Sequence, residues 1–78
     1  MSNMTLKQLT DRDKQFLFNV IKSKASAYKI AYKKKEIFRH VYRDLYIDGL
    51  YSGLIVAGYE YNIDLYNEMI QLWDEISY

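Results

Sequence analysis

The chain has 78 residues, a net charge of +1, no cysteine and one histidine. These values exclude disulfide frameworks and cysteine-based zinc sites, and the length allows a single small domain with a modest core. Half of the residues are apolar and 17% are aromatic, which is too hydrophobic for intrinsic disorder. Because proline is absent and only three glycines are present, long helices are favoured, and the predicted class is all-α.

The first predicted helix begins near Asp11. Thr10 is a favourable N-cap residue, and Asp11 and Asp13 would lie near the positive end of the helix dipole. We expect residues 1–78 to form one helical domain. Residues 1–9, which precede the first helix, are candidates for a flexible segment. Beyond the start, apolar residues recur at three- and four-residue steps, which predicts a buried stripe. Its members are Leu17, Val20, Ile21, Ala25, Tyr28, Ala31 and Tyr32.

A second apolar stripe predicts the second helix. Its members are Phe38, Val41, Tyr42, Leu45, Tyr46, Leu50, Leu54 and Ala57. The two stripes differ in phase, which favours a bend or break near residues 33–36. A break at 23–26, a turn at Asp48 and Gly49, and one long curved helix are the alternatives. Gly58 is a suitable end for this long second helix because glycine adopts the left-handed conformation readily.

The third predicted helix follows Asn62, a good N-cap residue. Its predicted inward residues are Leu65, Tyr66, Met69, Ile70, Leu72, Trp73 and Ile76, and its predicted outward residues are Asp64, Glu68, Asp74 and Glu75. The expected architecture is a small three-helix bundle. A core of this size without disulfides or a metal is expected to gain stability by self-association or by binding a partner.

Charge is strongly ordered along the chain. All eleven Lys and Arg residues lie at or before Arg43, and the seven acidic residues from Asp44 onward have no basic residue among them. Residues 22–43 can form a basic face on which Lys35, Arg39 and Arg43 are spaced by four. This face is expected to pair with the acidic third helix or to orient an acidic protein partner. Phosphate binding is the alternative use of the same face.

Small residues recur at Gly49, Gly53 and Ala57. Glycine inside a helix costs about 1 kcal/mol relative to alanine, so close packing of another helix is expected to offset it. That helix can belong to the same subunit or to a second copy. We predict Gly49, Gly53 and Ala57 as self-association residues.

Tyrosine is used nine times in the chain. A buried phenol needs a hydrogen-bond partner, so several of these side chains should be exposed. Tyrosine and arginine are enriched at protein–protein hot spots. We predict a partner-binding patch of Tyr51, Tyr59 and Tyr61, together with the cations Lys35, Arg39 and Arg43.

No catalytic, metal or cofactor site is predicted, because the chain lacks a cysteine nucleophile, a glycine-rich phosphate loop and metal-ligand spacing. The favoured function is a non-catalytic, homodimeric protein-interaction module, and an inhibitor that masks a larger macromolecule is a candidate role. One alternative is a nucleic-acid-binding protein that uses the basic face of residues 22–43. Another is a binder of small phosphorylated ligands in an intersubunit pocket of Tyr, Lys and Arg.

No apolar signal segment or membrane-length run is present, so we expect a cytoplasmic protein without membrane contact.

Overall fold

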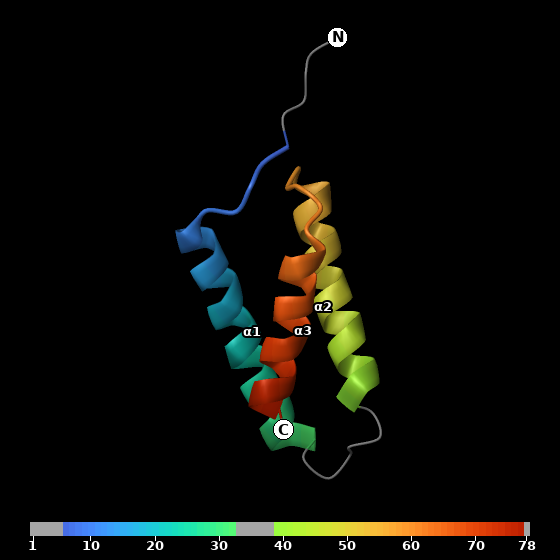
Figure 1. Cartoon of the computed structure of the whole chain (residues 1–78). Helices are drawn as coiled ribbons and strands as arrows, with labels where there is room; N and C mark the ends of the chain where they lie inside the picture. The colour runs from blue at the N-terminus through green and yellow to red at the C-terminus, as the bar shows by residue number, and fades with distance from the viewer. Residues whose placement is uncertain (1–5, 33–38, 78) are drawn as a thin grey trace.

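Three helices build the fold in the computed structural model, which describes residues 6–32 and 39–77. Helix α1 spans Asp11–Tyr32, α2 spans Arg39–Val56 and α3 spans Ile63–Ser77. In Figure 1, α1 and α3 run in the same direction and α2 runs in the opposite direction. Helix α3 packs against both other helices and makes the main interhelical contacts. The predicted all-α class with three helices is therefore confirmed for the described residues.

Local capping signals place the helix ends where the sequence predicts them. The backbone N–H of Asp13 donates a hydrogen bond to Thr10 Oγ1 at 3.1 Å, and the N–H of Leu65 donates one to Asn62 Oδ1 at 3.1 Å. Gly58 follows α2 with a φ of 98°, a conformation that side-chain-bearing residues rarely adopt. These three residues confirm the predicted starts of α1 and α3 and the predicted end of α2.

Two of the alternative breaks are absent. Helix α1 continues through residues 23–26, and α2 continues through Asp48 and Gly49. Helix α1 has 22 residues and α2 has 18. The predicted break at residues 33–36 lies outside the described residues.

The core is centred on Trp73, whose exposed fraction is 0%. The ring centroids of Tyr28, Tyr42 and Tyr46 lie 5.7, 5.8 and 5.5 Å from that of Trp73. Helices α1 and α2 thus supply aromatic side chains that surround a residue of α3. The remaining fully or nearly buried apolar residues are Leu17, Ile21, Ala25, Ile47, Tyr51, Leu65 and Met69. For α1 and α3 these residues belong to the predicted stripes.

Helix α2 departs from the prediction. Val41 and Leu45, predicted to face the core, are exposed, whereas Ile47 and Tyr51 are buried. The reason is that α2 carries apolar residues on nearly all of its sides, so periodicity alone does not determine which side packs inward. Contacts with α3 make that choice.

The segment before α1 is tied to the connection between α2 and α3. The N–H of Lys7 donates to the carbonyl oxygen of Gly58 at 2.9 Å, and the N–H of Glu60 donates to the carbonyl oxygen of Lys7 at 2.7 Å. The side-chain amide of Gln8 also donates to Glu60 at 3.1 Å. Residues separated by about fifty positions in the chain are thereby joined at one end of the bundle. None of the three described helices is both long and apolar enough to cross a membrane.

Candidate interaction surface

Arg43 joins the basic part of the chain to the acidic part. Its Nη1 donates to both carboxylate oxygens of Asp74, at 3.1 and 2.9 Å, and its Nε donates to Asp44 at 3.0 Å. Burial alone would lower the pKa of Arg43, but the hydrogen bonds to Asp74 and Asp44 outweigh it and raise the pKa above its ordinary value. Asp74, predicted to face outward, is half-buried, and both of its carboxylate oxygens accept from the same nitrogen, Nη1 of Arg43.

Intramolecular pairing uses only part of the charge. Apart from Arg43, the described ion pairs include Lys14 Nζ with Glu68 Oε1 at 3.3 Å. The side chains of Arg12, Lys22 and Lys29 are exposed and form no ion pair with another described residue. The expected pairing of α3 with the basic residues therefore occurs, but it leaves cations of α1 open to solvent.

Several members of the predicted basic face are not described. Lys35 and the side chain of Arg39 lie outside the described residues. Arg43, the third member, is held by Asp44 and Asp74, with 17% of its side chain exposed. Within the described part of the chain, this guanidinium is a structural cation rather than a free phosphate-binding group.

The predicted tyrosine patch divides into buried and exposed members. Tyr51 is buried, and its hydroxyl accepts a hydrogen bond from the N–H of Asn62, so its expected exposure is wrong. The fold uses this phenol to hold the start of α3. Tyr59 is half-buried, with Lys7 Nζ 5.1 Å from its ring centroid. Tyr61 is the most exposed of the three tyrosines, with an exposed fraction of 73%.

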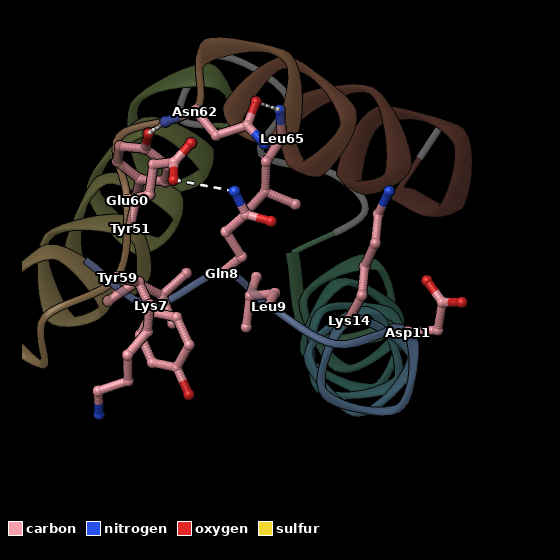
Figure 2. A pocket seen from close by; sticks show the side chains of 11 residues that line it. Lys7, Gln8, Leu9, Asp11, Lys14, Tyr51, Tyr59, Glu60, Asn62 and Leu65 are labelled. Atoms are coloured by element: carbon pink, nitrogen blue, oxygen red, sulfur yellow. Dashed lines mark hydrogen bonds between the residues drawn. The ribbon is translucent and has the colours of Figure 1, made fainter. Parts of the chain in front are cut away.

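A pocket of about 280 Å³ lies where the N-terminal segment meets α1, α2 and α3. Figure 2 shows Lys7 and Gln8 from that segment, Lys14 from α1 and Glu60 from the α2–α3 connection around it. Gln8 is bonded to Glu60, and Lys14 is paired with Glu68. The pocket therefore mixes both signs of charge, and several of its polar side chains are already bonded within the subunit, so its lining defines no ligand class. No group of three or more His, Cys, Asp or Glu side chains in the described part of the chain could hold a metal ion.

The most unusual surface runs along the side of α2 away from its buried residues. We call it the α2 outer face: Val41, Leu45, Gly49, Ser52 and Val56, spaced by three or four residues. Every member is exposed, Leu45 to 72% and Val56 to 88%. None is charged, although the outward side of a surface helix is ordinarily polar. In soluble proteins, large exposed apolar patches are often sites of interaction.

Gly49 and Gly53 of α2 have no close neighbour among the described residues outside their own helix. A Cβ atom added at Gly49 or Gly53 would have nothing within 4 Å beyond its own helix. The intramolecular explanation for the predicted small-residue stripe is therefore wrong at these two positions, because no helix of the subunit approaches them. Ala57 lies in the turn after α2 and is also exposed.

Helix α1 carries a second exposed apolar stripe. We call it the α1 outer face: Phe16, Val20, Ser23, Ala27 and Ile30, again spaced by three or four residues. Phe16 is 73% exposed and Ile30 is 79% exposed, while Val20 is half-buried. The buried stripe of α1 lies on a different side of the same helix. Helices α1 and α2 thus each present an apolar stripe to solvent.

The sequence prediction missed the two outer faces in different ways. Val41 and Leu45 belong to the stripe that was predicted to face the core, whereas Phe16 and Ile30 belong to no predicted stripe. For α2, the available signal was the uncharged run from Gly49 to Val56, in which no helical side is polar enough to face water.

No family model, curated protein or solved structure matches this chain.

Proposed function

We propose that the chain is a non-catalytic interaction module that self-associates through the α2 outer face. The observation that carries the proposal is the exposure of Leu45 and Val56 on a side of α2 that bears no charge. Fully burying one such side chain contributes about 1.5–3 kcal/mol. Because the core of the subunit is small, burial of the α2 outer face would add substantially to the stability of the protein.

The glycines of α2 support the same proposal. Each interior glycine lowers helix stability by about 1 kcal/mol relative to alanine. Gly49 and Gly53 receive no compensating contact from residues 6–32 or 39–77. A helix from outside can approach the backbone closely at these positions, which gives the glycines a physical role.

A second copy is the occupant that the charges favour. The α2 outer face is flanked on one side by Asp44 and Asp48, and no basic residue follows Arg43 in the chain. The exposed cations of α1, including Arg12, Lys22 and Lys29, supply the opposite sign in another copy. Complementary potentials of this kind raise the association rate and the specificity of a contact.

The test compares Leu45→Lys with Asn67→Lys. Both residues are exposed, but Asn67 lies on α3 away from the α2 outer face, so the second variant controls for the added charge. We expect the wild type and Asn67→Lys to sediment as dimers or larger species at micromolar concentration, and Leu45→Lys as a monomer with unchanged circular dichroism. A wild-type mass near 9.4 kDa over that range would contradict self-association.

Masking of a larger protein is the biological role that we propose for the associated module. Tyr61 and Ile63 are exposed together at the start of α3 and remain outside the α2 outer face. The nucleic-acid alternative has less support, because Arg43 is engaged by Asp44 and Asp74. A pull-down with wild type and Tyr61→Ala, repeated after nuclease treatment, separates the two. Protein capture that survives nuclease and weakens in Tyr61→Ala supports masking, and capture that nuclease abolishes supports the alternative.

A further inference from the structure

We infer that the surface meeting the α2 outer face is the α1 outer face of a second copy. This inference rests on the proposed self-association and identifies its second surface. Helix α1 would thereby use two sides. Leu17, Ile21 and other members of its buried stripe pack within the subunit, while Phe16 and Ile30 contact α2 of the other copy.

The two faces match in length. From Phe16 to Ile30 is 14 residues, or about 21 Å at the rise of an α-helix, and from Val41 to Val56 is 15 residues, or about 22 Å. Two helices packed along these stripes would therefore cover each other over their full extent.

The two faces also match in the order of large and small residues. Each has large apolar residues toward both ends, and each has two small residues between them: Ser23 and Ala27 on α1, Gly49 and Ser52 on α2. All four small residues are exposed. Two helices that cross at these positions can bring their backbones close together while the larger side chains fill the space on either side.

Charge favours this pairing over contact between two α2 outer faces. In an antiparallel pair of α2 helices centred on Gly49, Asp48 of each copy would lie beside its own counterpart, and like charges at such positions are destabilising. The α1 outer face instead continues from Arg12, one turn before Phe16, and Lys24 lies beside Val20. Cations of α1 would then accompany the acidic flank of α2.

If each copy places its α1 outer face on the α2 outer face of the other, the two contacts together form an isologous interface and close a two-fold dimer. If only one such contact joins two copies, the contact is heterologous and continues from copy to copy as a ring or an open chain. In both arrangements every subunit needs two intact faces. This requirement makes a mixing experiment decisive.

The experiment uses Phe16→Glu, which disables the α1 outer face, and Leu45→Lys, which disables the α2 outer face. Both side chains are more than 70% exposed, so neither change should unfold the subunit. Thermal melting and the fluorescence of the single Trp73 check folding. We expect each variant alone to be monomeric where the wild type associates. An equimolar mixture with one variant isotope-labelled should form a one-to-one complex by native mass spectrometry, because one contact between intact faces remains.

The outcomes separate this inference from the proposed function. If Phe16→Glu associates like the wild type while Leu45→Lys is monomeric, the α2 outer face pairs with itself and the inference is overturned, although self-association stands. A mixture that stays monomeric up to about 1 mM also overturns it. A wild-type protein that is monomeric throughout overturns the proposed function itself.

Discussion

Trp73 provides the most quantitative test of the core. A buried tryptophan removes about 150–250 Å² of surface from water, which corresponds to about 4–6 kcal/mol at about 25 cal/mol per Å². Trp73 has an exposed fraction of 0% and three tyrosine rings within 6 Å between centroids. Because alanine retains one carbon of the side chain and the cavity closes in part, we expect Trp73→Ala to lower the free energy of unfolding by about 3–5 kcal/mol.

That loss is comparable to the total stability of the domain. At about 0.05–0.15 kcal/mol per residue, a chain of this length has about 4–12 kcal/mol to lose. Urea titration followed by circular dichroism, at a concentration where the protein is monomeric, measures the difference. Trp73→Phe is the matched control. It keeps an aromatic ring among Tyr28, Tyr42 and Tyr46 and removes the buried indole N–H, which has no hydrogen-bond partner in the described part of the chain. Its loss of unfolding free energy should therefore be clearly smaller.

The fluorescence of the wild type gives an independent measurement, because Trp73 is the only tryptophan. We expect blue-shifted emission and poor quenching by acrylamide. Emission typical of a solvated indole, together with an unchanged melting temperature in Trp73→Ala, would show that α3 does not dock between α1 and α2 as described.

The remaining predictions concern glycine conformation and alkaline pH. Gly49→Ala should raise the stability of the monomer by about 1 kcal/mol, because the added Cβ meets open space on a helix. Gly58→Ala should instead lower it by about 1–2 kcal/mol, because its φ of 98° is strained for alanine; equal signs for the two in urea titration would contradict the assigned backbone. The hydrogen bond that Tyr66 donates to Asp48, followed by burial, raises the pKa of Tyr66 from 10.0 to about 12. The stability that this hydrogen bond contributes is therefore complete below about pH 10 and is lost as the pH rises to about 12. Over that interval the melting temperature of Tyr66→Phe should fall less than that of the wild type.

The sequence alone determined the features that depend on neighbouring residues. Thr10 and Asn62 begin their helices because each side chain reaches a backbone N–H only three positions away. Gly58 ends α2 because a positive φ is a property of that one residue. The inward side of α3 was also predictable, since Asp64, Glu68 and Glu75 share one side of the helix and Leu65, Met69 and Trp73 share another.

The tertiary structure decided what depends on distant residues. Helix α2 has apolar residues on nearly all sides, so only contact with α3 determined that Ile47 is buried and Leu45 exposed. The pairing of Arg43 with Asp74 joins residues 31 positions apart. The sequence contains several other acidic residues that could have paired with Arg43, so it could not identify Asp74 as the partner. Local periodicity carries information about the side of one helix, whereas the choice among several apolar sides depends on how neighbouring helices fit together. The two outer faces became visible only after that choice had been made.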